Sequence, residues 1–277
     1  MEKAKILNGN GMNRVIVIGD LHGRDLWKKV LFGNNQNFEL WRNEYDLGIH
    51  KESHYHIDDY DEVVFIGDYT DSFKIMNVEI LHNLKEIILV KNTYPHKVHL
   101  LIGNHDLQYI YNQQRFICSG YRSEMAYDLH QEFKNADFEL AYQIDNILFT
   151  HAGIINKWSD LYLNTLPEKY TRFFQGNETI AEKLNILYQC NYEPLFDVGF
   201  LRRGYLPFGG PLWADKTEME EDYLKGYLNI VGHTATDKIE MNINGDEGVI
   251  FIDTCDVGQF LILEIFNGKI DFDFLYL

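Results

Sequence analysis

The segment RVIVIGDLHG, residues 14–23, decides how this chain folds. A β-branched apolar run stops there at a Gly-Asp pair, which is the pattern of a buried strand whose carboxyl end carries a polar loop. The same plan recurs in EVVFIGDYTD at residues 62–71 and in KVHLLIGNHD at residues 97–106. It recurs again in NILFTHAG at residues 146–153 and in LNIVGHT at residues 228–234. These segments predict five strands that each end in a polar loop.

Helical patterns lie between these strands. Apolar side chains share one face at intervals of three and four residues in 24–32, 73–92 and 123–135, and residues 178–190 form a further helical run. Alternation of strands and helices predicts an α/β fold, and we expect the five strands to belong to one sheet.

The C-terminal part no longer alternates strand-like and helical segments. Residues 248–254, 259–266 and 269–277 are strand-like and are joined by short turns, so we expect antiparallel pairing in a closing meander and a second sheet. Residues 33–61 and 156–215 interrupt the alternation of strands and helices. Because they contain no repeat and no low-complexity linker, we interpret them as insertions in a single domain that spans residues 1–277.

The composition excludes several classes of function. The chain has a net charge of −17 and 45% hydrophobic residues, which is typical of a packed globular protein without a basic face. Long nucleic acids and anionic membranes are therefore not expected as partners. The chain has no apolar run long enough to span a membrane and no signal-peptide pattern, and its three cysteines lack a CxxC spacing. We expect a cytoplasmic location.

Metal-ligating side chains follow the five predicted strands. Because ligands collect beyond the carboxyl ends of strands in an α/β sheet, these side chains are expected to converge. Packing so many carboxylates and imidazoles together without a cation would cost several kcal/mol. Divalent metals would make such a cluster stable. The candidate ligands are Asp20, His22, Asp68, Asn104, His151 and His233.

The number of ligands predicts two metal ions. Asp20 and His22 are assigned to the first ion, and the Asn and the two later His residues to the second. Asp68 is expected to bridge the pair through its two oxygens. Two ions about 3.5–4 Å apart would hold a hydroxide between them and clamp a phosphate for in-line displacement. The predicted reaction is hydrolysis of a phosphoester.

His105 is the candidate general acid. It follows the ligand Asn104 but points the other way if the turn is extended, which leaves it free to protonate the leaving oxygen. Asp71, in the loop after the second strand, is placed to hold the imidazole in its protonated orientation.

The motifs GDLHG, GDYTD, GNHD, THAG and VGHT, in this order between residues 19 and 234, resemble the signatures of the calcineurin-like metallophosphoesterases. PLWAD at residues 211–215 resembles a further stretch of the branch that holds Ser/Thr phosphoprotein phosphatases and diadenosine tetraphosphate hydrolases. The resemblance implies an α/β/β/α sandwich of two mixed sheets flanked by helices. It also implies two divalent metals, manganese foremost, with iron or zinc as alternatives.

The chain departs from this branch at one position. Asp71 is followed by Ser72-Phe73, where the family loop continues into Arg-Gly, so a phosphate-gripping arginine is absent from its usual place. Arg202 and Arg203 occupy the region where the branch supplies another phosphate-binding arginine. Either guanidinium would suit a bidentate contact with phosphate.

The first hypothesis is a dimetal phosphatase acting on a phosphomonoester, a phosphoprotein or a dinucleoside polyphosphate. The alternatives are a phosphodiesterase or nucleic-acid end phosphatase, and a non-catalytic scaffold of the same fold. The scaffold would require missing ligands, and a nucleic-acid enzyme would require positive charge around the site. A phosphorylated small molecule or phosphoprotein is the expected partner. The sequence leaves the oligomeric state open.

Overall fold

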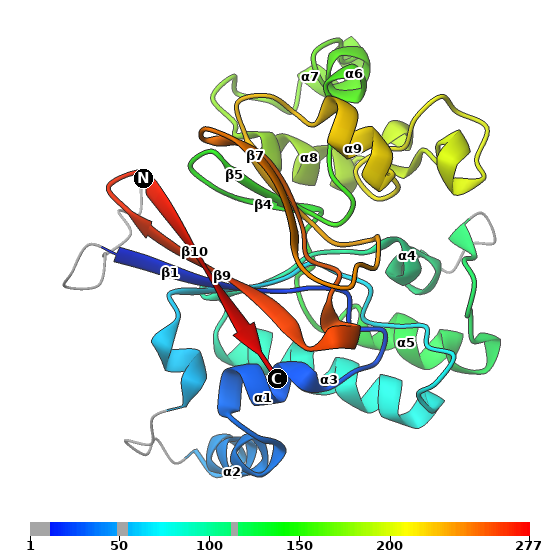
Figure 1. The fold of residues 1–277 in the computed structure, drawn as a ribbon. Coiled ribbons are helices and arrows are strands. Elements are labelled where there is room, and N and C mark those ends of the chain that lie inside the picture. Colours follow the sequence, from blue (N-terminus) through cyan, green and yellow to red (C-terminus); the bar gives the residue numbers. More distant parts are fainter. Residues whose placement is uncertain (1–11, 49–54, 112–115) are drawn as a thin grey trace.

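Two five-stranded β-sheets stack face to face in the computed structural model, which describes residues 12–48, 55–111 and 116–277 (Figure 1). The first sheet has the order β10-β9-β1-β2-β3, with β1 Met12–Ile18, β2 Glu62–Phe65, β3 Val98–Leu100, β9 Gln259–Phe266 and β10 Lys269–Tyr276. The second has the order β4-β5-β6-β8-β7, with β4 Ala141–Ile144, β5 Ile147–Thr150, β6 Leu228–Val231, β7 Glu240–Asn244 and β8 Glu247–Phe251.

Both sheets are mixed. β1, β2 and β3 pair in parallel in the first sheet, and β5, β6 and β8 do so in the second, while the outer pairs are antiparallel. The predicted α/β fold with two mixed sheets is confirmed. The expectation that all five motif strands share one sheet is wrong, because the first three lie in one sheet and β5 and β6 lie in the other.

Strand β1 shows why the motif strands read as continuous apolar runs. Val15 and Val17 pack between the two sheets, while Ile16 and Ile18 pack against the helices on the outer face. A strand that is buried on both faces has no polar side to alternate with, so its sequence is uniformly apolar. The motif strands are thereby held in place on both faces, which fixes the positions of their carboxyl ends.

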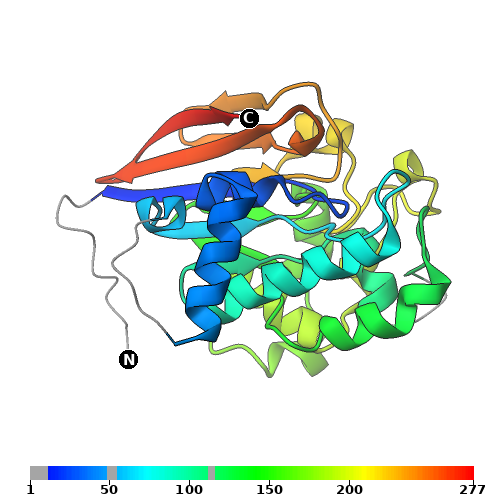
Figure 2. The ribbon, with the colours of Figure 1, turned by 90° about the horizontal axis from the view of Figure 1, so that it is seen from below.

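Helices cover both outer faces. In the N-terminal half, α1 Leu26–Phe32, α2 Asn35–Asp46, α3 Asn77–Thr93, η3 Ser123–Met125 and α5 Ala126–Glu132 lie across the first sheet (Figure 2). The second sheet is covered by α6 Asn156–Trp158, π-helix η4 Ser159–Leu163, α7 Glu168–Thr171, α8 Ile180–Gln189, η5 Glu193–Phe196 and α9 Lys216–Asp222. The remaining helices are η1 His56–Asp59, α4 Asn104–Ile110, η6 Phe200–Arg202 and η7 Cys255–Val257. Within the described ranges, no helix has the length and apolarity that a membrane span requires.

The stretch 33–61, interpreted as an insertion, contains the helix α2, whose buried residues are Phe38 and Trp41. The expected closing meander is wrong for its first strand, residues 248–254. β8 pairs with β6 and β7, and the chain then crosses to the first sheet, where β9 pairs with β1 and β10. Gly258 permits the change of direction after η7, because it adopts a left-handed φ of 68°.

His99 joins the two sheets away from the motif loops. Its Nε2 lies 2.9 Å from Glu62 of β2, and its Nδ1 lies 3.2 Å from Glu139, which precedes β4. The ring of Tyr142 in β4 stacks on the imidazole at 3.6 Å between centroids. Burial opposes the charge on His99, but hydrogen bonds and charges from the two glutamates outweigh it and raise the pKa of His99.

This contact predicts that stability depends on pH. Because the pKa of His99 is higher in the folded chain than its usual 6.5, the folded state binds more protons above that pH. The stabilisation is complete below about pH 6.5 and is lost as pH rises through the folded pKa of His99. We expect the free energy of unfolding in urea to fall over this range by at most about 1.4 kcal/mol per pH unit.

The matched variant is His99→Gln, which keeps a polar side chain but does not titrate. Lys91 and Lys97 also face Glu62, and burial lowers the pKa of both, so the wild-type curve minus the variant curve is needed to isolate the histidine. A difference curve that stays level above about pH 6.5 contradicts this assignment.

Candidate metal centre

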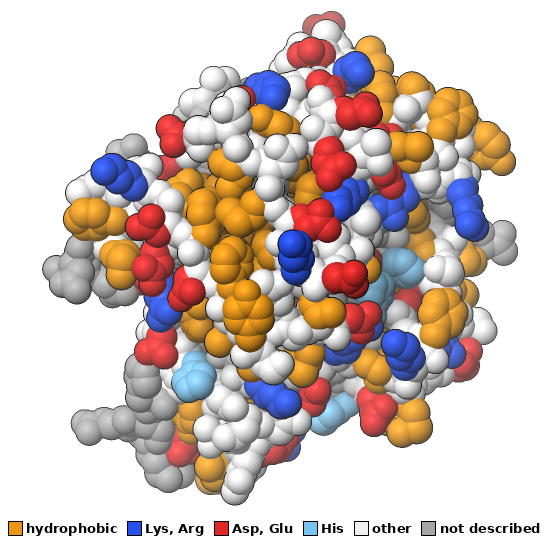
Figure 3. Space-filling view, viewed as in Figure 1, with side chains coloured by type: hydrophobic (Ala, Val, Ile, Leu, Met, Phe, Trp, Pro, Cys, Tyr) orange, Lys and Arg blue, Asp and Glu red, His pale blue; other side chains and the backbone are white. Residues whose placement is uncertain are grey.

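The loops after the motif strands meet at one edge of the sandwich. Figure 3 shows histidine side chains in a hollow on this face, with charged side chains of both signs around it. Two groups of side chains within the described residues could each hold a metal ion, with ligand atoms within 4.8 Å of one another. The first group is Asp20, His22 and Asp68, and the second is Asp68, His151 and His233.

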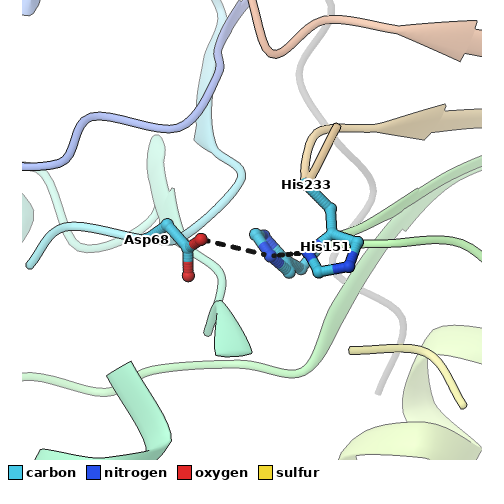
Figure 4. Close-up of side chains that lie close together, drawn as sticks. All are labelled: Asp68, His151 and His233. Atoms are coloured by element: carbon cyan, nitrogen blue, oxygen red, sulfur yellow. Dashed lines mark hydrogen bonds and ion pairs between the residues drawn. The ribbon is translucent and has the colours of Figure 1, made fainter. Parts of the chain in front are cut away.

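In the second group, the candidate ligand atoms lie around Nε2 of His151. Nε2 of His151 lies 3.5 Å from Oδ2 of Asp68 and 3.2 Å from Nδ1 of His233 (Figure 4). Oδ1 of Asn104 lies 2.8 Å from the same Nε2. The other ring nitrogen of His151 is 3.0 Å from the carbonyl oxygen of Ile66, which only accepts, so Nδ1 carries the hydrogen. In the neutral ring, Nε2 therefore presents a lone pair to the other ligands.

The first group follows the same rule. Nδ1 of His22 lies 3.0 Å from the carbonyl oxygen of Thr70 and donates to it. Its Nε2 then presents a lone pair toward Oδ2 of Asp68, 3.8 Å away. Asp20 lies 1% exposed, and its carboxylate accepts the backbone N–H of His233 at 3.0 Å. A carboxylate from the first sheet is thus tied to the loop after β6 in the second sheet.

Asp68 occupies the shared position with one oxygen. Its Oδ2 faces the Nε2 atoms of both His22 and His151, whereas its Oδ1 accepts the backbone N–H of His105 at 2.9 Å. The expectation that Asp68 bridges two ions through its two oxygens stays a prediction. A single oxygen directed at both groups is the arrangement that the structure presents.

The donor set fits divalent cations. Nε2 of His151 and Oδ1 of Asn104 are both acceptors, and they face each other at 2.8 Å without a hydrogen between them. Neutral imidazoles, carboxylates and an amide oxygen are ligands that manganese, iron and zinc accept. Burial lowers the pKa of His151, and burial together with the charges of His151 and Arg202 lowers the pKa of His233. Both rings are therefore kept neutral for coordination.

The carboxylates show the electrostatic cost of this arrangement. Burial and the charges of Asp253 and Asp68 raise the pKa of Asp20. Burial also raises the pKa of Asp253 to about 6, where His22 opposes the shift. Burial disfavours the charge on Asp68 as well, but four histidines, His151 foremost, hold the pKa of Asp68 below its usual range. Cations between these groups would offset the repulsion.

Strained backbone places several of these side chains. Positive φ values, which side-chain-bearing residues rarely adopt, occur at His22, Asp68, Asp71 and His233. Two glycines allow the loops after β2 and β3 to interlock. A Cβ at Gly67 would lie 2.4 Å from the backbone nitrogen of Gly103, and a Cβ at Gly103 would lie 2.1 Å from Oδ1 of Asp68.

Asp106 organises the loop that carries Asp68, a role that the sequence did not reveal. Its fully buried carboxylate accepts the backbone N–H groups of Asp68, Tyr69 and Gly103 at 2.9, 3.0 and 2.9 Å. The hydroxyl of Thr70 also donates to it at 3.3 Å. The signal was present in the sequence, because Asp106 is the third residue of a helix that starts directly after a glycine.

His105 and Asp71 are brought together as predicted. Nδ1 of His105 lies 3.0 Å from Oδ2 of Asp71. Gln108 and Tyr109, which the sequence analysis did not single out, donate to the same carboxylate. His105, Gln108 and Tyr109 lie at i, i+3 and i+4 on α4, a spacing that indicates one helix face. Burial opposes the charge on His105, but Asp68 and Asp71 outweigh it and raise the pKa of His105 to about 9.

The structure separates the two candidate arginines. The Arg202 guanidinium binds Asp215 with Nε at 2.8 Å from Oδ2, and Nη2 donates to Thr234, the neighbour of His233. Arg203 has a left-handed φ of 66° and an exposed side chain without a described partner. Only Arg202 is therefore brought close to the ligand His233.

The comparisons with known proteins identify the family. Residues 13–237 match the family model of the calcineurin-like phosphoesterases, and the chain belongs to this family. A cold-active protein-tyrosine phosphatase of a psychrophilic Shewanella species has a similar fold, with 18% identity and a TM-score of 0.53. The match covers 96% of this chain and 81% of that one. A metallophosphoesterase from Sphaerobacter thermophilus matches with 11% identity and a TM-score of 0.36 over 95% and 88% of the two chains. The search of curated proteins found no significant match.

The family and the candidate ligand groups both indicate metal-dependent chemistry. The family supports a metal-dependent phosphoesterase, that is, a hydrolase with a dinuclear metal centre and a phosphorylated substrate. The solved structures show likeness of fold alone at this level of identity.

The hydrogen bonds of Asp106 predict the effect of Asp106→Asn. The amide would place a donor against backbone N–H groups that now meet an oxygen, so the loop of Asp68 would lose a charged acceptor. We expect the free energy of unfolding to fall by roughly 2–3 kcal/mol and manganese binding to weaken. Urea denaturation and titration calorimetry with manganese measure the two effects. The control Asp128→Asn, on the exposed face of α5, should change stability by less than about 0.5 kcal/mol. Equal stability of both variants contradicts the role of Asp106.

Proposed function

We propose that this phosphoesterase cleaves its substrate at two divalent metal ions by in-line attack of water on phosphorus. The observation that supports the proposal is the convergence of lone pairs from two sheets on the single oxygen Oδ2 of Asp68. When bound, the two cations supply the positive charge that neutralises phosphate oxygens and activates the attacking water. Asp20 and His22 would hold one cation, and Asn104, His151 and His233 the other. Manganese is the proposed metal, with iron or zinc as alternatives.

His105 is the proposed general acid. Its Nδ1 is engaged by Asp71, so Nε2 carries the proton that the leaving oxygen needs. Gln108 and Tyr109 fix the Asp71 carboxylate and therefore the plane of the imidazole. Asp68 and Asp71 raise the pKa of His105 to about 9, so the ring is protonated at neutral pH and has a proton to donate.

Arg202 is the proposed phosphate-binding arginine in place of the residue that Ser72 replaces. It is fixed by Asp215, which also caps α9 by accepting the N–H of Thr217 at 2.9 Å. A guanidinium that is held by a carboxylate loses little freedom when it binds phosphate.

The substrate proposed is a compact phosphoester: a phosphomonoester, a phosphoprotein or a dinucleoside polyphosphate. The likeness in fold to a protein-tyrosine phosphatase adds phosphotyrosine peptides to the substrates worth testing. The net charge of −17 argues against long nucleic acids, because a polyphosphate backbone would need a basic groove.

Asp68→Asn tests the proposal directly. The amide removes one negative charge from the position shared by both ions, so we expect metal content and hydrolysis of p-nitrophenyl phosphate to be lost together while far-UV circular dichroism stays unchanged. Elemental analysis and a steady-state assay after reconstitution with manganese give both quantities. Wild-type protein that binds less than one metal per chain, or that hydrolyses no phosphoester, defeats the proposal.

His105→Asn separates proton donation from metal binding. The variant should keep its metal content, yet lose about 10²–10⁴-fold in rate on esters with poor leaving groups such as phenyl phosphate. The loss on p-nitrophenyl phosphate should be much smaller, because p-nitrophenolate leaves without a proton. Equal losses on both esters remove His105 from this role.

Arg202→Ala and Arg203→Ala form a matched pair, because the two arginines are neighbours in the sequence and only Arg202 contacts Asp215 and Thr234. We expect kcat/KM to fall about ten-fold or more for Arg202→Ala, in line with the loss of a charged hydrogen bond to phosphate. Arg203→Ala should stay within about two-fold of wild type, because its side chain points to solvent. Steady-state kinetics on p-nitrophenyl phosphate provide the comparison. The reverse order of effects contradicts the assignment.

A further inference from the structure

A cavity of about 500 Å³ lies between α1 and α3, next to the first group of metal ligands. One wall begins at Gly23, the residue after the ligand His22, and another is formed by Cys255 and Asp256 in η7. None of the proposed ligands lines the cavity. Its volume lies in the range of pockets that bind small ligands, about 300–1,000 Å³.

The chain connects the cavity to the first group of metal ligands, and its use as a leaving-group site rests on the proposed function. The rings of His105 and His22 meet edge to face with centroids 5.2 Å apart. If His105 protonates the leaving oxygen, a leaving group that passes His22 would reach this cavity. Gly23 comes next along the chain and is the first residue of the cavity wall.

The positive charges in the cavity wall are neutralised within the chain. Arg24 forms an ion pair with Asp256, and its Nη1 donates to the carbonyl of Leu21 at 2.9 Å. Lys28, 9% exposed in its side chain, lies 2.5 Å from a carboxylate oxygen of Glu86. The charge of each of these two cations is therefore compensated by a carboxylate of the chain.

Two carboxylates of the wall keep their charge. Asp25 and Glu79 are exposed, and neither forms an ion pair in the part of the chain that the structure describes. Their hydrogen bonds are to neutral donors, since Asp25 accepts from the amide of Asn35 at 2.9 Å and Glu79 from the backbone N–H of Met76 at 3.1 Å. His82, the other titratable side chain here, contacts Glu86 at 3.0 Å. The uncompensated charge at the cavity is therefore negative.

We propose that this cavity binds the leaving-group side of a phosphopeptide and favours a Lys or Arg side chain next to the phosphorylated residue. A cationic side chain would complement Asp25 and Glu79, and its aliphatic stem would contact Leu26 and Ile75, which also line the cavity. The same carboxylates repel further phosphates, so a dinucleoside polyphosphate is the poorer substrate.

The test compares two short phosphopeptides that differ only in the residues on either side of the phosphorylated one, Lys in one and Glu in the other. The phosphorylated residue is tyrosine or serine, whichever wild-type protein cleaves faster. We expect kcat/KM to be about ten-fold higher for the basic peptide at low ionic strength, and the preference to shrink as sodium chloride is raised. This salt series needs no variant.

The variant Asp25→Asn with Glu79→Gln should reduce the basic-to-acidic ratio of kcat/KM by about three- to ten-fold. The control Asp145→Asn with Asp246→Asn removes two exposed carboxylates from turns of the second sheet and should leave the ratio unchanged. A ratio near one in wild type, the same ratio in both double variants, or faster cleavage of diadenosine tetraphosphate overturns the proposal. If wild type hydrolyses p-nitrophenyl phosphate but gives one of these results, the cavity proposal fails and the proposed function stands. If wild type does not hydrolyse p-nitrophenyl phosphate, the proposed function itself fails.

Discussion

The buried carboxylate of Asp106 is the interaction on which the centre depends. It accepts backbone N–H groups from Asp68, Tyr69 and Gly103, and so it fixes the loop after β2 to the loop after β3. Burial and the charge of Asp68 raise the pKa of Asp106, and the hydrogen bonds from Gly103 and Tyr69 oppose this shift and stabilise the carboxylate. The contact leaves Asp68 in a left-handed conformation with Oδ2 facing two imidazoles.

The second constraint is that the centre lies where the two sheets join. Asp20 follows β1 and accepts the backbone N–H of His233, which follows β6. His151 follows β5 and donates to the carbonyl of Ile66, which follows β2. A Cβ at Gly232 would lie 2.1 Å from Oδ1 of Asp20, so the loops approach each other as closely as a glycine allows. The strands that build the core thus also set the distances between the ligands.

Sequence patterns predicted the parts of the molecule that depend on local rules. β6 and β9 have the predicted bounds, because their apolar runs end at clear turn signals. The six candidate ligands could be named because Asp, Asn and His follow these strands directly, and their role as ligands stays a prediction. The division of the strands between two sheets could not be predicted, since strands buried on both faces have the same pattern in one sheet or two.

Other features depend on distant contacts and were missed for that reason. α2 was not predicted, because it buries only Phe38 and Trp41 among polar neighbours. The contacts of Arg202 with Asp215 and Thr234, and the contact of Oδ1 of Asp68 with the N–H of His105, also join distant parts of the chain. Each of these contacts joins residues whose pairing no local pattern specifies.

The central claim, that the two groups of side chains that share Asp68 would each hold a divalent cation, is tested most directly by anomalous diffraction from crystals of manganese-reconstituted protein. The account predicts two manganese peaks about 3.5–4 Å apart. One should lie among Asp20, His22 and Asp68, and the other among Asp68, Asn104, His151 and His233. A single peak, or two peaks of which one lies away from Asp68, would contradict it.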